Sequence, residues 1–212
     1  MSKNEKNKRK AYNIKIIFLG EAGVGKTSLI NAYLGNSFNA QTMTSYSPKQ
    51  STKKIKLDNF KLKLILWDTM GQEKYRSLSK SFIKGSNIVI LVYDITRRES
   101  FLELDFWANS VKEELGNDEA IIGIVGNKID LFTKTEVEKL EGENYAQKLN
   151  GYFSETSAKD NPGGFEIFVQ TLLENLISNK NIIDKLEELI ENDTSFSLEE
   201  SPNDNKKKCC NN

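Results

Sequence analysis

Residues 20–27 read Gly-Glu-Ala-Gly-Val-Gly-Lys-Thr, and this stretch decides the fold of the 212-residue chain. It follows the apolar run Ile14 to Leu19 and precedes apolar residues at helical spacing, so it joins a strand to a helix. It matches the pattern GxxxxGK[ST], whose glycines let backbone N–H groups close around phosphate oxygens. We therefore predict a phosphate-binding loop, in which Lys26 contacts the β and γ phosphates and Thr27 places its hydroxyl on Mg²⁺.

Strand and helix patterns alternate along the chain. The predicted strands are residues 14–19, 55–57, 62–67, 88–93 and 121–125, and the predicted helices after the first are residues 74–83, 100–115, 136–149 and 162–177. Such alternation predicts an α/β fold with right-handed crossovers and a largely parallel sheet. In that fold Gly20, Asp68 and Asn127, which each end a strand, meet at one edge of the sheet, where ligands bind.

The composition excludes several classes of function. Lysine plus arginine equals aspartate plus glutamate, 30 each, so the basic excess of a nucleic-acid binder is missing. The chain has no histidine, which excludes an imidazole general base and histidine-ligated zinc. Cys209 and Cys210 are the only cysteines, so a disulfide framework or a CxxC metal site is excluded and a reducing, cytosolic setting fits.

We expect one domain between two tails. Residues 1–11 are polar and basic and predict a flexible arm. Residues 12–180 carry the alternating strands and helices of the domain. Residues 181–212 are interpreted as a variable tether, although an apolar pattern at 182–190 is compatible with a prolonged helix.

Residues 127–130 read Asn-Lys-Ile-Asp and follow an apolar strand. The carboxylate of Asp130 can accept two N–H groups from guanine. Adenine offers no matching pair of donors, so its binding would leave a desolvated carboxylate unsatisfied. The stretch favours guanine binding, although a solvated turn after a strand would give the same four residues.

Residues 68–72 read Asp-Thr-Met-Gly-Gln and follow another strand. Asp68 can hold Mg²⁺ through water, and the N–H of Gly71 can meet the γ-phosphate. The amide of Gln72 both donates and accepts, which suits the orientation of an attacking water. A surface turn is the alternative interpretation of this stretch alone.

Five stretches, GEAGVGKTS, WDTMGQE, LVYDIT, GNKID and ETSAK, occur in the order found in Rab proteins. Over residues 12–177 the chain therefore resembles a Rab-like small GTPase of the Ras superfamily, with a divergent first switch. The resemblance implies a P-loop small GTPase fold, a six-stranded, mostly parallel sheet flanked by five helices. It implies a switch that binds and slowly hydrolyses GTP with Mg²⁺, and that regulates vesicle trafficking by recruiting effectors.

The resemblance also assigns the site residues. It gives catalysis to Gln72 and Lys26, and it gives the metal to Thr27, Ser45 and Asp68. The nucleotide-binding residues that it implies are Ala22, Gly23, Val24, Gly25, Lys26, Thr27, Ser28, Phe38, Ser45, Gly71, Asn127, Lys128, Asp130, Ser157, Ala158 and Lys159. In this set Lys128 covers one face of guanine and Phe38 lies at the opposite edge. Residues 157–159 contact the base through their backbone.

The first switch departs from the family's pattern. Where a threonine is usual, counting places Ser45, whose hydroxyl keeps the capacity to bind Mg²⁺, with Thr44 as the fallback if the loop shifts by one residue. The hydrophobic triad that contacts effectors maps to Gln50, Trp67 and Phe82, with glutamine in place of phenylalanine. These departures leave an alternative function, a nucleotide-locked, membrane-anchored binding scaffold with impaired hydrolysis.

The chain ends Lys-Lys-Lys-Cys-Cys-Asn-Asn, which resembles the double-cysteine ends of Rab proteins that receive two geranylgeranyl groups. Two lipids on Cys209 and Cys210 beside a basic triplet give stable attachment to an anionic membrane, whereas incidental cysteines in a disordered tail are the alternative. The expected location is cytoplasmic, peripheral on the cytosolic face of an endomembrane compartment. The implied partners are an exchange factor, a GTPase-activating protein, effectors and prenyl-binding escort proteins, and no nucleic acid.

Overall fold

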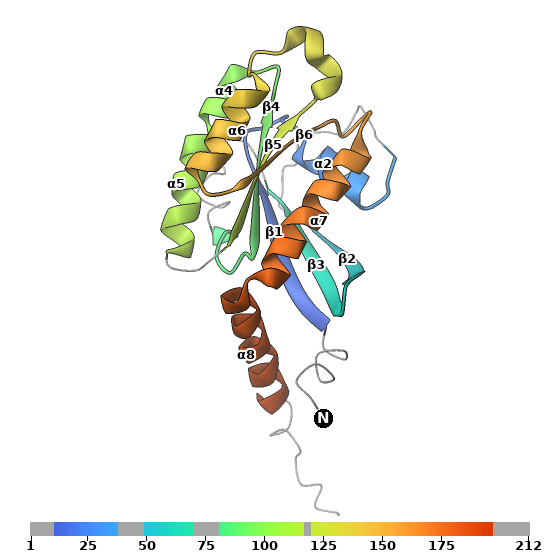
Figure 1. The fold of residues 1–212 in the computed structure, drawn as a ribbon, viewed down its shortest axis with the longest axis vertical. Helices are drawn as coiled ribbons and strands as arrows, with labels where there is room; N and C mark the ends of the chain where they lie inside the picture. The colour runs from blue at the N-terminus through green and yellow to red at the C-terminus, as the bar shows by residue number, and fades with distance from the viewer. Residues whose placement is uncertain (1–10, 38–48, 70–80, 117–119, 197–212) are drawn as a thin grey trace, which may run out of the picture.

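The computed structural model describes residues 11–37, 49–69, 81–116 and 120–196. Its centre is a six-stranded sheet with the order β2-β3-β1-β4-β5-β6, in which β2 is antiparallel to β3 and the other neighbours are parallel (Figure 1). The strands are β1 (Ala11–Leu19), β2 (Lys49–Leu57), β3 (Phe60–Asp68), β4 (Ile88–Asp94), β5 (Ile121–Asn127) and β6 (Tyr152–Thr156). The helices are α2 (Lys26–Tyr33), α4 (Arg98–Leu102), α5 (Leu104–Leu115), α6 (Lys139–Lys148), α7 (Pro162–Ser178) and α8 (Lys180–Phe196), with a 3-10 helix η2 (Ile129–Lys134).

Helices cover both faces of the sheet, and the strand sequences follow from this. Along β1, Ile14, Ile16 and Phe18 pack on one face, while Ile17 and Leu19 pack on the other. Strands buried on both faces read as continuous apolar runs because each of the alternating side chains enters a core. The first face lies against α2 and α7, and the second lies against α4, α5 and α6 (Figure 1).

The expected fold class and sheet are confirmed, and the predicted strands 55–57 and 62–67 lie in the antiparallel pair β2 and β3. The helices differ from the expected five. Within the described ranges there are six α-helices, because the predicted helix 100–115 is divided at Glu103 and because α8 follows α7. Glu103, with φ of −66° and ψ of −13°, lies between α4 and α5. The predicted helix 74–83 lies mostly outside the described residues.

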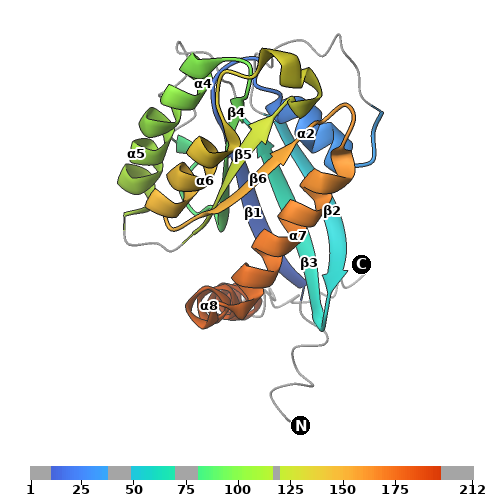
Figure 2. The same ribbon diagram turned by 45° about the horizontal axis from the view of Figure 1, so that its top comes forward.

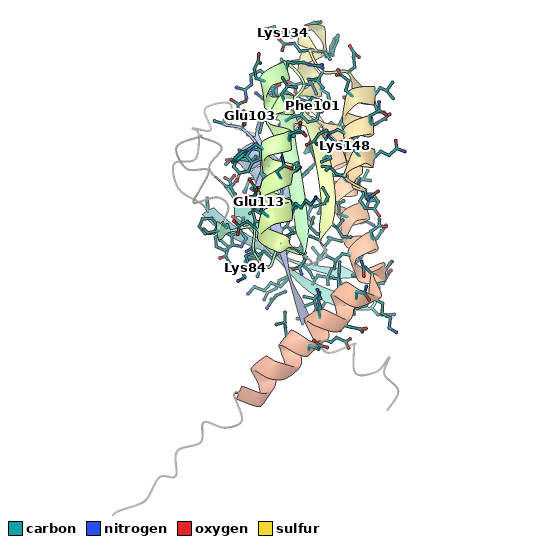
Figure 3. The ribbon with its side chains drawn as sticks, turned by 90° about the vertical axis from the view of Figure 1, so that its left-hand side faces the viewer. Lys84, Phe101, Glu103, Glu113, Lys134 and Lys148 are labelled. Carbon is teal, nitrogen blue, oxygen red and sulfur yellow. The ribbon has the colours of Figure 1, made fainter. Side chains whose placement is uncertain are left out.

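Helix α8 continues the packed structure past the predicted end of the domain at residue 180. Ile182 and Leu186 are buried in the core that α7 covers, and the hydroxyl of Tyr12 donates to Glu187 Oε1 at 3.1 Å. The predicted tether from 181 therefore begins with docked helix, because two apolar side chains at i, i+4 spacing reach the core. Farther along, Leu189 is 63% exposed, and Figure 3 shows α8 leading away from the body of the domain. Among the described residues, no helix is long and apolar enough to cross a bilayer.

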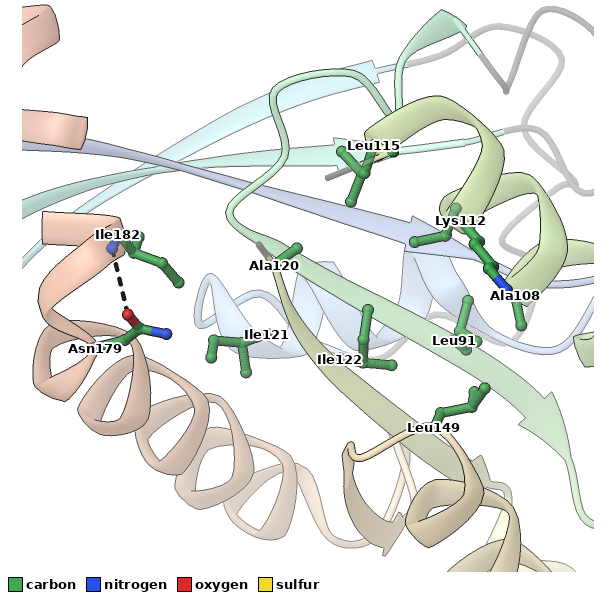
Figure 4. Close-up of a pocket in the computed structure, with 12 residues that line it drawn as sticks. Leu91, Ala108, Lys112, Leu115, Ala120, Ile121, Ile122, Leu149, Asn179 and Ile182 are labelled. Carbon is green, nitrogen blue, oxygen red and sulfur yellow. Dashed lines mark hydrogen bonds between the residues drawn. The ribbon is translucent and has the colours of Figure 1, made fainter. Parts of the chain in front are cut away.

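A pocket of about 390 Å³ lies between β4, β5, α5 and the start of α8 (Figure 4). Its lining is mainly apolar and includes Leu91, Leu115 and Ile182, with Lys112 and Asn179 as polar members. Of the residues that we predicted for the site, none of those that the structure describes lines this pocket. The predicted site lies instead at the carboxyl ends of the strands, which Figure 2 turns toward the viewer.

Candidate nucleotide-binding site

The loop after β1 has the backbone that a phosphate-binding turn requires. Gly20, Gly23 and Gly25 have φ values of 143°, 76° and 102°, in the left-handed region that favours glycine. A Cβ on Gly20 would lie 2.1 Å from the carbonyl oxygen of Val92, and one on Gly25 would lie 2.2 Å from Asn127 Nδ2. The loop therefore passes tightly over β4 and β5 and leads directly into the N-terminus of α2, where an anion is stabilised.

Lys26, the first residue of α2, carries its ammonium group inside this loop. Its side chain donates to the carbonyl oxygens of Gly20 and Glu21, both at 2.8 Å, and the residue is 5% exposed. Burial lowers the pKa of Lys26 from its ordinary 10.5 to about 8, although the carboxylates of Asp68 and Glu21 act in the opposite direction. A buried ammonium whose hydrogen-bond partners among the described residues are two carbonyl oxygens is suited to pair with the anionic oxygens of a phosphate chain.

Thr27 and Asp68 bring two oxygen ligands together beside that lysine. The hydroxyl of Thr27 donates to Asp68 Oδ2 at 2.7 Å, and Asp68 is 3% exposed at the end of β3. Thr69 fixes this end of β3, because its hydroxyl donates to the carbonyl of Phe18 on β1. A hydroxyl and a carboxylate in contact are hard oxygen donors of the kind that Mg²⁺ prefers, so the pair fits the metal predicted here.

Asn127, at the end of β5, joins three loops with one side chain. Its Nδ2 donates to the carbonyl of Val24 in the phosphate loop at 2.8 Å, and its Oδ1 accepts from the backbone N–H of Ala158 at 3.2 Å. The residue is 1% exposed. The loop predicted to hold phosphates and the segments predicted to hold the base are therefore held in one arrangement by a buried amide.

The residues predicted to read the base lie next to this amide. Ser157 Oγ donates to Asp130 Oδ1 at 2.6 Å and accepts from the backbone N–H groups of Lys159 at 3.2 Å and Asp160 at 3.0 Å. Lys128 has a φ of 71°, and its Nζ lies 2.6 Å from Asp94 Oδ2. The loops after β5 and β6 thus lie in contact, in the arrangement that the family resemblance implies.

Several predicted residues lie outside the part of the chain that the structure describes. They are Phe38, Ser45, Gly71, Gln72, Cys209 and Cys210, together with the fallback Thr44 and most of residues 40–50 and 70–82, which resemble the two nucleotide-sensitive switches of the family. The residues mapped to the effector triad are described. Gln50 on β2 pairs with Trp67 on β3, and the ring centroids of Trp67 and Phe82 are 5.0 Å apart, so the three positions form one surface.

Two residues of the site were not predicted. Asp94 at the end of β4 bonds Lys128, and Arg97 donates from Nη2 to Glu21 Oε2 at 2.9 Å and to the Ala22 carbonyl at 3.0 Å. Both lie in or next to LVYDIT, which contributed only to the family resemblance. The signal that could have found Asp94 is a carboxylate directly after a strand that is apolar on both faces, since such a charge needs a partner when it is buried.

Comparisons with known proteins agree with this geometry. The sequence model of the Ras family matches residues 15–177. The chain is 41% identical over 160 residues to the Ras-related protein Rab-21 of Homo sapiens, which covers 76% of this chain and 71% of that protein. It is 40% identical over 167 residues to the Ras-related protein Rab-11B of Dictyostelium discoideum, which covers 79% of this chain and 73% of that protein. The chain therefore belongs to the Ras family and is a Rab-like small GTPase, a GTP-binding switch of vesicle trafficking.

Proposed function

We propose that this chain binds GTP and GDP with Mg²⁺ at the carboxyl ends of its strands and that it hydrolyses the bound GTP slowly. The observation that carries this proposal is the double hydrogen bond of Asn127, which holds the glycine loop and the base segment together. A nucleotide is a rigid base joined to a phosphate chain, so a site for it needs these two subsites at a fixed separation.

Each end of the nucleotide has its own groups. Lys26 neutralises the β and γ phosphates from inside the loop. Its hydrogen bonds to the carbonyl oxygens of Gly20 and Glu21 hold the ammonium group in position. Thr27 and, through a water, Asp68 would hold Mg²⁺, which would neutralise part of the negative charge of the phosphates. Asp130 accepts the two N–H groups of guanine, and Ser157 orients that carboxylate through its 2.6 Å hydrogen bond.

Hydrolysis requires a water in line with the γ-phosphate. From the family pattern, we assign the orientation of this water to Gln72. We assign to Ser45 the contact that the first switch makes with Mg²⁺. The amide of Gln72 orients the water by hydrogen bonds and does not keep its proton. The products are GDP and phosphate, and the protons of the water pass to phosphate and solvent. The rate without a partner is slow because in this class an arginine, commonly supplied by an activating protein, stabilises the transition-state charge.

Single-turnover hydrolysis tests this assignment. In the full-length chain loaded with Mg²⁺ and GTP, we expect a rate on the order of 10⁻⁴ to 10⁻² s⁻¹, which falls by about tenfold or more in Gln72→Leu and also falls in Ser45→Ala. Gln147→Leu, on an exposed face of α6, is the matched control and keeps the wild-type rate. Tight GTP binding with no hydrolysis above background, unchanged by either substitution, would instead support the locked scaffold.

The switch acts through its partners and through a membrane. We assign effector contact to the surface of Gln50, Trp67 and Phe82. This surface borders the two switches, so its shape would depend on which nucleotide is bound. An exchange factor restores GTP, a GTPase-activating protein accelerates hydrolysis, and a prenyl-binding escort protein shields the lipids. The polar Gln50 in an otherwise aromatic surface favours effectors that differ from those of relatives with phenylalanine there.

We assign geranylgeranyl groups to Cys209 and Cys210, which would hold the chain peripherally on the cytosolic face of an endomembrane. In cells, Cys209→Ser with Cys210→Ser is expected to move the protein from the membrane fraction to the soluble fraction. Either single substitution should lose most of the membrane-bound protein, because one lipid gives only marginal binding. Asn211→Ser is the control for the tail, and a double-serine variant that stays on membranes would contradict the assignment.

A further inference from the structure

A buried carboxylate pairs with Lys128, the residue to which the family resemblance assigns one face of the base. The side chain of Asp94 is 2% exposed, and its Oδ2 is 2.6 Å from Lys128 Nζ. Its Oδ1 accepts from both the backbone N–H and the hydroxyl of Thr96, at 3.0 and 2.7 Å. Both oxygens are therefore engaged, and the orientation of the carboxylate is fixed by the turn that follows β4.

Arg97 extends this arrangement to the phosphate loop. Its Nη2 donates to the Glu21 carboxylate and to the Ala22 carbonyl, and its Nε lies 3.7 Å from Asp94 Oδ2. The planar guanidinium holds several partners in one fixed geometry, which a lysine would not. One residue of the β4–α4 turn thus touches the loop at its second and third residues.

We propose that Asp94 and Arg97 are positioning residues, which tie the base-covering Lys128 to the phosphate-binding loop and thereby set how long a guanine nucleotide stays bound. This inference rests on the proposed nucleotide site. Neither residue is expected to touch the nucleotide. They act through Lys128 and through the loop backbone.

The geometry of Lys128 supports this role. A lysine with a φ of 71° occupies a backbone region that non-glycine residues rarely adopt, so the surrounding contacts must hold it there. The side chain is 33% exposed, and its ion pair with a carboxylate that is 2% exposed is screened less than a surface pair. Without Asp94 the long side chain of Lys128 can adopt many rotamers. Nucleotide binding must then restrict that side chain, and the lost conformational entropy weakens binding.

Dissociation of fluorescent GDP, chased with excess unlabelled GDP, measures the effect in the full-length chain. We expect about tenfold faster dissociation in Asp94→Asn and about threefold in Arg97→Gln, because each loses a hydrogen bond between charged groups. Arg98→Gln is the matched control and keeps the wild-type rate. Arg98 is the next residue and also forms an ion pair, at 2.6 Å, but its partner is Glu141 on α6.

Two further readouts separate positioning from a general loss of structure. Inosine diphosphate lacks the amino group that Asp130 reads, so the ratio of GDP to inosine diphosphate dissociation rates should change in Asp130→Asn and stay constant in Asp94→Asn. Lys128→Met should abolish the effect of Asp94→Asn, since residues that act through one contact are not additive.

The outcomes are distinct. Faster dissociation in Arg97→Gln with a normal Arg98→Gln, and non-additivity of Asp94→Asn with Lys128→Met, support the inference. A wild-type rate in Arg97→Gln overturns it, even if Asp94→Asn fails to fold, and so does simple additivity of the Asp94 and Lys128 changes. A wild-type chain that binds no guanine nucleotide would overturn the proposed function itself, which is a different result.

Discussion

Replacing Gly20 with alanine is expected to lower the free energy of unfolding by about 3 kcal/mol or more, or to prevent folding. The new Cβ would lie 2.1 Å from the carbonyl oxygen of Val92, which is backbone in β4. This strand cannot shift easily, because it pairs with β1 on one side and β5 on the other. The φ of 143° adds strain for any residue with a side chain. Thermal or urea denaturation measures the loss.

Gly85→Ala is the matched control for this prediction. Gly85 also has a positive φ, 70°, but a Cβ there would meet no atom of the described residues within 4 Å. Its substitution should cost only the backbone strain, about 1 kcal/mol. Equal losses of stability in the two variants would show that the close approach of the loop to β4 is not what requires glycine at Gly20.

Asn127→Ala is expected to accelerate GDP dissociation by roughly 100-fold and to lower the free energy of unfolding by about 2–5 kcal/mol. The substitution leaves the carbonyl of Val24 and the backbone N–H of Ala158 without the side chain that bonds both. An unsatisfied buried polar group costs more than a hydrogen bond contributes. The phosphate loop and the base segment also lose their common anchor, so binding weakens beyond the loss of stability. Stopped-flow dissociation and denaturation measure the two effects separately.

Asn175→Ala provides the comparison. Its side chain also bonds at both ends, accepting from the Tyr152 hydroxyl at 2.7 Å and donating to the Thr171 carbonyl at 2.8 Å. It lies on α7, and its two partners, Tyr152 and Thr171, are not among the residues assigned to the site. We expect Asn175→Ala to lose stability while GDP dissociates at the wild-type rate. If both asparagine variants changed dissociation alike, Asn127 would act through general stability and not through the site.

The central part of the fold could be predicted because its signals are local. Continuous apolar runs identified β1 and β4, because a strand that is covered on both faces carries apolar side chains on both of them. The docking of α8 could not be predicted in the same way. Ile182 and Leu186 follow an ordinary amphipathic spacing, and only their contact with the core distinguishes a docked helix from a tether. Strand β6 is short and was implied only by the family resemblance.

In the candidate site, too, the residues in local sequence patterns could be predicted, whereas those that depend on tertiary contacts could not. The glycine loop and the segment from Asn127 to Asp130 could be predicted, because spacing in the sequence alone fixes which groups face the ligand. The contact between Arg97 and Glu21 joins residues that are 76 positions apart. It depends on where the turn after β4 places a long side chain, and no local pattern records that. The segment from Ser157 to Lys159 was found only through the family resemblance.

The most direct test of the central claim is the identity of the nucleotide that the purified chain carries. Protein purified with Mg²⁺ throughout is denatured, and the released nucleotide is identified and quantified against the protein. We expect about one guanine nucleotide per chain, GDP or GTP, and its loss in Asn127→Ala. An adenine nucleotide in its place, or no nucleotide together with no binding of added GDP, would show that this chain has no guanine-nucleotide site.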